Sequence, residues 1–352
     1  MSARIPLSYT LSWPFRYLFP SKKNRSGLVA GPISNTFTSD STSETRRILF
    51  FGDLMGMRYD KVPTTDENVR QLFRSSDLII GNLESPVTFD TRKFRFYHGI
   101  ILHKIGLDYI LKYLDNFDID PQKLIMSLAN NHIGDQGERG MAVTMSYLNR
   151  MNIRYTGDKQ VADFPFKRVD LDGLQIGIAA WTHWLNWHVF SNSHGVWTDS
   201  AIRQFDWIQI KEQAGLDYLI GTPHWDYEFQ HYPAMKTREF ASYLLSYGFD
   251  LLVGHHPHVL QPVETFDTGL CFYSIGNLNF PELPFLRWPV RLSAFIEIEL
   301  FAGGKEKGML KQYTVHPYLQ VPGKEGVKIS LLDIAPSRYK DKLQERVAFL
   351  FK

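Results

Sequence analysis

Short apolar runs alternate with amphipathic stretches along most of the chain. Each apolar run predicts a buried strand, and apolar residues spaced three and four apart predict helices between the runs. Regular alternation of strand and helix favours an α/β fold with a largely parallel sheet and helices outside. The expected strands are 47–51, 77–80, 123–128, 217–220, 249–253 and 271–275, and the expected helices are 66–75, 107–117, 138–151, 199–215, 237–247 and 337–352.

A second pattern, alternation of apolar and polar residues, predicts antiparallel strands added to this sheet. It occurs in 292–301 and in 309–318. Residues 166–181 are expected to form a hairpin that turns at Asp172-Gly173, because Asp-Gly favours the two-residue turn of hairpins.

The same patterns divide the chain into three parts. Residues 1–46, of which 21–46 are polar and rich in Ser and Thr, are expected to form a loosely ordered tail and linker. We expect residues 47–320 to form the main domain. Residues 321–352 are then a C-terminal extension with a closing helix.

The aromatic stretch 5–20 is interrupted by prolines and has neither the apolar core nor the cleavage site of a signal peptide. No apolar run is long enough for a transmembrane helix, so we expect a cytoplasmic protein. With Lys22, Lys23 and Arg25 following it, the stretch could make a peripheral membrane contact. The alternative, which we favour, is a tail that packs across the domain surface.

Composition narrows the function classes further. The chain has 352 residues, 44% of them hydrophobic, which is enough for a large core. A net charge of +2 gives no reason to expect nucleic-acid binding. The single cysteine, Cys271, excludes an intramolecular disulfide and a thiolate metal cage.

The candidate chemistry begins with a histidine cluster after the expected strand 249–253. His255, His256 and His258 lie within four positions, preceded by Gly254. Neutral imidazole is the commonest metal ligand, and a His-x-His pair at a strand end can turn both rings toward one point. The cluster therefore predicts a metal site.

Other expected strands also end in residues that can bind metal. In α/β folds, ligands bind beyond the carboxyl ends of strands. Oxygen and nitrogen ligands without sulfur fit a pair of divalent ions with one bridging carboxylate, and suit Mn, Fe or Zn better than Mg or Ca. The candidates are Asp53, Glu84, Asn131, His132, His224, His256 and His258.

The order of these motifs resembles the CapA family of capsule and poly-γ-glutamate synthesis proteins, within the calcineurin-like metallophosphatase superfamily. The resemblance implies a four-layer α/β sandwich with a metal centre at the strand ends. The matching motifs are Phe51-Gly-Asp-Leu-Met55, Gly81-Asn-Leu-Glu84, Ala129-Asn-Asn-His-Ile-Gly-Asp135, His224-Trp-Asp-Tyr-Glu228, Gly254-His-His-Pro-His258 with Gln261, and Tyr273-Ser-Ile-Gly-Asn277.

The resemblance also implies a role for each matching residue. His132 is expected to stabilise or protonate the leaving group, and Asp135 either orients His132 or caps the helix that starts near Gly137. The implied metal ligands are Asp53, Glu84 as the bridging carboxylate, Asn131 as the amide, and His224, His256 and His258 as the imidazoles. Residues expected to support the ligands or contact substrate are Asn82, Asn130, Asp226, Glu228, His255 and Asn277.

This sequence departs from the wider superfamily at three positions. Met55 stands where a histidine is usual, and Gly-Asn-Leu-Glu replaces Gly-Asp, so one metal site could be weak. Asp226 stands where many relatives have Gly. Relatives in capsule assembly often carry an N-terminal membrane anchor. Because this sequence has no apolar run of the length that an anchor needs, a direct role in a membrane synthase complex is not expected.

Two further clusters each have two interpretations. Trp181, Trp184 and Trp187, with His183 and His188, line a substrate cleft or form a packed lid. The basic residues Arg92, Lys93 and Arg95 bind a polyanion or belong to a solvated loop.

The main functional hypothesis is a metal-dependent hydrolase that cleaves a phosphoester or a γ-glutamyl bond with metal-activated water. The alternative is a non-catalytic subunit that binds polyglutamate or another anionic polymer during export or attachment. A third hypothesis, a structural core without metal, leaves buried polar groups that would each need another partner.

Overall fold

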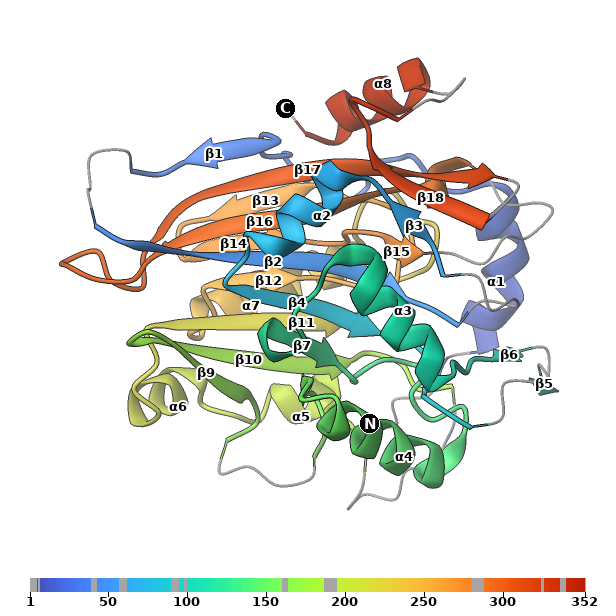
Figure 1. Cartoon of the computed structure of the whole chain (residues 1–352). Coiled ribbons are helices and arrows are strands. Elements are labelled where there is room, and N and C mark those ends of the chain that lie inside the picture. The colour runs from blue at the N-terminus through green and yellow to red at the C-terminus, as the bar shows by residue number, and fades with distance from the viewer. Residues whose placement is uncertain are drawn as a thin grey trace.

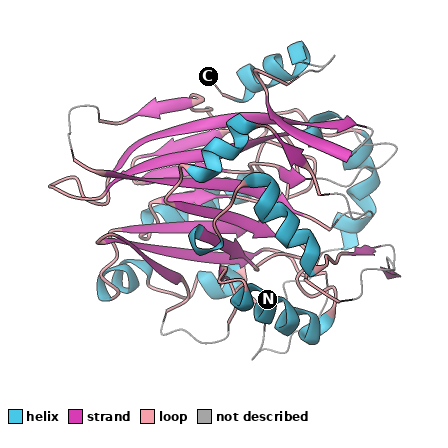
Figure 2. Ribbon diagram, in the orientation of Figure 1, coloured by secondary structure: helices cyan, strands magenta, loops and turns pink. Residues whose placement is uncertain are grey.

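The computed structural model describes residues 5, 7–38, 43–56, 62–89, 95–97, 100–159, 164–186, 195–279, 288–323, 326–335 and 340–351. Two β-sheets pack face to face, and helices lie on their outer sides (Figures 1 and 2). Arg92, Lys93, Trp187 and His188, which the sequence analysis singled out, lie outside the described residues.

The larger sheet has a parallel half and an antiparallel half. The parallel half follows the order β2 (Thr45–Leu54), β4 (Leu78–Leu83), β7 (Leu124–Ser127) and β8 (Arg154–Thr156). The other half, on the far side of β2, contains the antiparallel strands β16 (Leu292–Phe301), β17 (Leu310–Gly323) and β18 (Gly326–Leu331). At its edge, the short β3 (Thr64–Thr65) pairs in parallel with β18. At its margins, β1 (Ser34–Thr36) pairs with β17 and β15 (Asn277–Asn279) pairs with β2.

The smaller sheet has parallel strands at its centre and an antiparallel strand at each edge. Its order is β13 (Val263–Phe266), β14 (Gly269–Phe272), β12 (Leu251–Val253), β11 (Tyr218–His224), β10 (Leu174–Thr182) and β9 (Lys167–Leu171). The expected hairpin is β9–β10, with Asp172 and Gly173 at φ 51° and 93°. A separate pair joins β5 (Arg95–Tyr97) and β6 (Ile100–Leu102).

Successive side chains of a strand face opposite sides of its sheet, so each sheet packs against one core on either face. Ile48 and Phe50 face the core between the sheets, whereas Leu49 and Phe51 face the outer core of the larger sheet. That outer face is covered by α2 (Glu67–Arg74), α3 (Leu107–Phe117) and α4 (Gly137–Arg150). The outer face of the smaller sheet is covered by α5 (Asp199–Ile202), α6 (Trp207–Gln213) and α7 (Met235–Ser246). The prediction of a four-layer α/β sandwich is confirmed.

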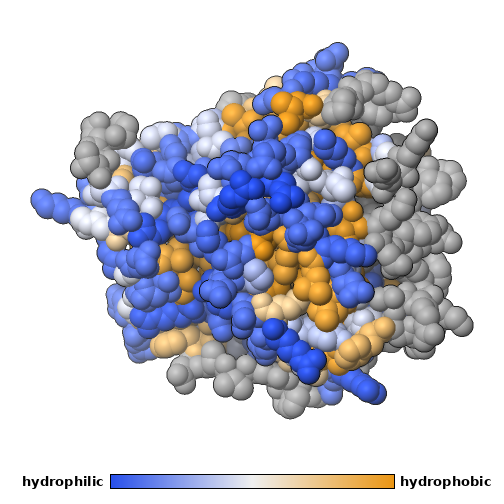
Figure 3. Space-filling model, in the orientation of Figure 1, coloured by the Kyte–Doolittle hydropathy of each residue, from blue (hydrophilic) through white to orange (hydrophobic). Residues whose placement is uncertain are grey.

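Other elements close the edges of the sandwich. α8 (Lys340–Leu350) buries Leu343 and Val347 against the core between the sheets. Single-turn 3-10 helices occupy Pro121–Lys123 and Trp288–Arg291. The face drawn in Figure 3 is mostly hydrophilic, with apolar side chains gathered over α3, where Leu111 is exposed.

The carboxyl ends of the parallel strands lie at one end of the sandwich. The arrowheads of β4, β7 and β10 all point to the same end in Figure 1, where α1 (Leu7–Leu18) also lies. Chain segments that follow these strands therefore converge at this end, as expected for an α/β ligand site.

Two local expectations differ from the structure. The helix expected at 199–215 is two helices, α5 and α6, because the Asp206 side chain accepts a hydrogen bond from Gln209 N and starts a new helix. The segment expected to be a loose tail contains α1 and β1. The division at residues 47 and 320 stays a prediction.

Candidate metal centre

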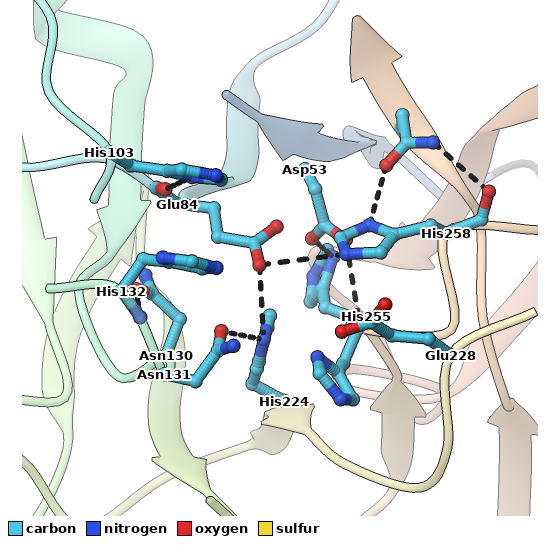
Figure 4. Close-up of polar contacts among 12 residues, drawn as sticks. Asp53, Glu84, His103, Asn130, Asn131, His132, His224, Glu228, His255 and His258 are labelled. Carbon is cyan, nitrogen blue, oxygen red and sulfur yellow. Dashed lines mark hydrogen bonds and ion pairs between the residues drawn. The ribbon is translucent and has the colours of Figure 1, made fainter. Parts of the chain in front are cut away.

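Carboxylates and imidazoles from both sheets meet at this end of the sandwich. Asp53 ends β2, Glu84 follows β4, and His224 ends β11. The histidine cluster follows β12, and in Figure 4 the side chains of Asp53, Glu84, His224 and His258 point toward one another. These four side chains and His256 are all buried.

The backbone around these residues is unusually tight. A Cβ on Gly52 would lie 2.0 Å from the Gly276 carbonyl oxygen, and one on Gly254 would lie 2.1 Å from that of Tyr273. Only glycine allows the strands to approach this closely. His256 and His258 adopt φ of 95° and 55°, a conformation that is costly for a non-glycine residue and is typical of functional sites.

Asp53 is surrounded by hydrogen-bond donors. His255 Nδ1 and His258 Nδ1 each lie 3.2 Å from a carboxylate oxygen, His256 N donates at 3.2 Å, and Asn82 Nδ2 donates at 2.8 Å. Burial opposes the charged form, but the close imidazoles of His255 and His258 hold the pKa of Asp53 well below its usual value. Asp53 is therefore ionised.

Glu84 has the opposite environment. Both carboxylate oxygens are buried, and neither has a hydrogen-bond partner within the described part of the chain. Burial, followed by the negative charge of Asp53, raises the pKa of Glu84 well above its usual value. A buried carboxylate without a donor is expensive unless a cation neutralises it.

The ligand atoms fall into two groups that share Glu84. In the group of Asp53, Glu84 and His224, and in that of Glu84, His256 and His258, the atoms lie within 4.8 Å of one another. The nearest approaches to Glu84 Oε1 are 3.4 Å from His224 Nε2 and 3.8 Å from His258 Nε2. A buried set of imidazoles and carboxylates fits a divalent metal ion.

Asparagines hold the ligand side chains in place. Asn131 Oδ1 accepts from His224 Nε2 at 2.9 Å, and Asn277 Oδ1 accepts from His258 Nδ1 at 2.8 Å. Asn130 Nδ2 donates to Asn82 Oδ1 at 3.2 Å, and Asn82 in turn donates to Asp53. Such contacts fix the orientation of metal-ligating groups.

His132 lies beside the two ligand groups and bonds to Asp135. His132 Nδ1 lies 2.6 Å from Asp135 Oδ2, which also accepts from His103 N at 2.6 Å. The residue before α4 is Gln136, and no side chain caps this helix, so the structure favours the orienting interpretation of Asp135. Burial lowers the pKa of His132 to about 3 and raises that of Asp135 to about 7.

Asp226 does not add a carboxylate to the centre in the described residues. Its oxygens accept from Tyr227 N at 2.8 Å and from Ala234 N at 2.7 Å. The side chain therefore closes the loop after β11. Glu228, two residues later, accepts from the indole nitrogen of Trp13 in α1.

Sequence reasoning missed His103 and the residues of α1. His103 stacks on His132 with ring centroids 3.6 Å apart, and its Nδ1 donates to Glu84 O at 3.1 Å. It lies in an irregular segment, so no periodicity or motif marks it. Burial and the nearby His132 lower the pKa of His103 to about 3.

α1 contacts the centre through Tyr9. Its hydroxyl lies 3.0 Å from His256 Nε2, and its ring stacks on Tyr227 at 5.4 Å between centroids. Arg16 lies 4.2 Å above the same ring. The aromatic stretch thus packs on the domain, as favoured above, whereas membrane contact stays a prediction.

Trp181 and Trp184 pack within the described part of the 181–190 segment. Trp181 is fully buried against Phe249. Trp184 contacts the Tyr9 ring at 5.5 Å and donates to Asp226 O. These two residues therefore agree with the packed interpretation. No helix among the described residues has the length and apolarity needed to cross a membrane.

Comparison with known proteins identifies relatives. The family model described as "Bacterial capsule synthesis protein PGA_cap" matches residues 47–282. The PGA biosynthesis protein CapA of Bacillus subtilis is 26% identical over 335 residues, 91% of this chain and 82% of that protein. The capsule biosynthesis protein CapA of Bacillus anthracis is 24% identical over 256 residues, 68% of this chain and 61% of that protein.

Among solved structures, a phosphatase from Mycoplasma pneumoniae is similar, with 12% identity and a TM-score of 0.47. The similarity covers 79% of this chain and 95% of that one.

Proposed function

The chain belongs to the bacterial capsule synthesis protein family, and we propose that it is a metal-dependent hydrolase of capsule or poly-γ-glutamate metabolism. Glu84 is the observation that carries this proposal. Its two oxygens are buried without a donor and belong to both groups of potential ligands. Asp53, whose pKa lies well below its usual value, and His224 and His256, whose pKa values burial lowers well below the usual value, face the same space.

We infer that two divalent ions of the Mn, Fe or Zn class bind here. Asp53, Glu84 and His224 would hold one ion, Glu84, His256 and His258 would hold the other, and Asn131 would add an amide ligand. When bound, such ions polarise a phosphoryl or carbonyl oxygen and make water a nucleophile at neutral pH.

The protein's own part in the reaction falls to His132. Its Nδ1 is bonded to Asp135, whose pKa burial raises to about 7. With the proton of this bond on Asp135, the ring would carry its own proton on Nε2 and could donate it to the leaving group. Stacking on His103 fixes the plane of the ring. The bond cleaved would be a phosphoester or a γ-glutamyl amide, and the anionic substrate would enter beside His132, which is 9% exposed.

A second candidate is a non-catalytic subunit that binds polyglutamate or another anionic polymer. The observation that favours it is closure of the centre. Asp53, Glu84 and His256 are 0% exposed, and α1 lies against His256. Such a protein would bind polymer without turnover, and the binding would depend little on Asp53.

Metal content by mass spectrometry, on protein purified without a histidine tag, tests the proposal. We expect two equivalents of metal per chain, with loss in Asp53→Ala and His256→Ala. His183→Ala is the matched control, because the His183 side chain pairs with Asp199 and belongs to neither ligand group. Absence of metal after supplementation would overturn the hydrolase in favour of the binding subunit.

Activity then separates the two candidates. Wild-type protein loaded with metal should hydrolyse a phosphoester or a γ-glutamyl oligomer. His132→Ala should keep its metal and lose at least about a hundredfold in turnover, the usual contribution of a general acid. Equal turnover in His132→Ala would remove this residue from the mechanism.

A further inference from the structure

A second cluster of titratable groups lies where three distant segments meet. The loop after β11 carries His231 and Tyr232, and His231 N donates to Ser21 O at 3.1 Å. The Tyr232 ring meets the edge of Phe349 in α8, with centroids 5.9 Å apart. Arg346, one turn earlier in α8, lies 5.2 Å above the Phe349 ring.

Several polar atoms of this cluster lack hydrogen-bond partners among the residues that the structure describes. His231 is 2% exposed, and neither ring nitrogen makes a hydrogen bond. Arg346 is 7% exposed, and its Nε and Nη2 are buried without an acceptor. Buried donors of a charged group are expensive to leave unpaired, so these unpaired atoms need an explanation.

The local charge is positive. Burial, then the positive charges of Arg346 and Lys22, lowers the pKa of His231 well below its usual value. Burial also lowers the pKa of Arg346 to about 10. Neither side chain forms an ion pair within the part of the chain that the structure describes. An anion is the kind of group that would supply the missing acceptors here.

We propose that Arg346 and His231 form an oxyanion site, separate from the metal centre, that binds a carboxylate or phosphate group. Nε and Nη2 form one edge of the guanidinium, and this edge binds two oxygens of one anion in parallel. His231 supplies a further donor, and Lys22 adds charge from the segment before β1.

The position of this site suggests what it does. The loop that carries His231 also carries Glu228, which contacts α1 beside the metal centre. An anion bound by Arg346 and His231 would tie α8 and the N-terminal segment to that loop. γ-Linked glutamate leaves a free carboxylate on every residue, so a polymer could supply the anion; this part rests on the proposed function. A free phosphate offers the same chemistry.

Calorimetric titration of metal-stripped protein separates these sources. Inorganic phosphate and a γ-linked glutamate oligomer are titrated separately into wild type, Arg346→Met and Arg346→Lys. We expect at least tenfold weaker binding in Arg346→Met, and also a loss in Arg346→Lys, which keeps the charge without the two-nitrogen edge. Arg150→Met is the matched control, because Arg150 is an exposed arginine at the end of α4.

Thermal unfolding gives a second readout that does not depend on a measured affinity. Without anion, Arg346→Met should unfold at the same temperature as wild type or higher, because an unpaired buried charge is gone. With anion, wild type and Arg150→Met should gain stability, whereas Arg346→Met should not. His231→Phe should reduce the gain without abolishing it.

Binding of either anion supports the site if the binding depends on Arg346. Which of the two anions binds, the oligomer or phosphate, identifies the source. Equal binding of both anions by wild type and Arg346→Met overturns it. So does the absence of binding by wild type. The metal content of the unstripped protein is measured in parallel. Because metal content tests the proposed hydrolase, failure of the anion site can be told apart from failure of the hydrolase.

Discussion

The two-sheet body and α1 are held in place by different forces. In the body, strands pair over long registers and bury alternate residues in the cores on both faces. α1 buries only Tyr9. It is attached by contacts to Trp184, Tyr227, Glu228, Phe229 and His256. Its outward residues are exposed, with Leu7 at 74%, Leu11 at 66% and Phe15 at 68%. The body is stabilised by buried area, whereas the helix over the centre is held by a few specific contacts.

Substitution of a core ring should give the largest contrast. Phe50→Ala removes a side chain that is 1% exposed between the sheets and should lower the free energy of unfolding by about 3–5 kcal/mol. Phe15→Ala, on the outside of α1, should change it by less than about 0.5 kcal/mol. Denaturant unfolding measures both. Equal losses would mean that α1 belongs to the cooperative core.

Metal removal should have the next largest effect, and only on the body. Ions at about a hundred times their dissociation constant stabilise the native state by about 2.7 kcal/mol. A chelator should therefore lower the unfolding midpoint of wild type but leave that of Glu84→Gln unchanged. A chelator effect of the same size in Glu84→Gln would place the ion elsewhere.

The smallest effect should come from the contact between α1 and the centre. Tyr9→Phe removes the hydroxyl that bonds to His256, at a cost of about 1 kcal/mol. Because the loss is local, proteolytic cleavage within 7–38 should rise roughly fivefold while the global unfolding midpoint stays nearly constant. Thr10→Ala, on the exposed side of α1, is the control. Unchanged proteolysis would show that the hydroxyl does not hold the helix.

This contrast also explains what could be predicted from the sequence. The strands and most helices follow from apolar periodicity, because the sheets bury whole faces. The break at Asp206 was missed because a single side chain, not the pattern, starts α6. α1 was missed because its buried face is aromatic and narrow, and Pro14 lies inside it.

The candidate site divides in the same way. Asp53, Glu84, His224 and the histidine cluster meet because parallel strands bring their carboxyl ends together. His103, Tyr9 and Trp13 arrive from segments without strand or motif signals, so only the tertiary structure reveals them. Asp226 shows the reverse: its place in the sequence indicated the centre, but two backbone N–H groups of its own loop bind its carboxylate.

The contact between the Tyr9 hydroxyl and His256 should limit the rate at which ions enter the centre. Because Asp53, Glu84 and His256 are 0% exposed, we expect an ion to reach them only after the structure opens. At low concentration, the observed rate of ion uptake should rise in proportion to the ion. At high concentration it should level off at the opening rate, so that the helix, and not the encounter of ion and ligand, sets the speed at which the centre is loaded.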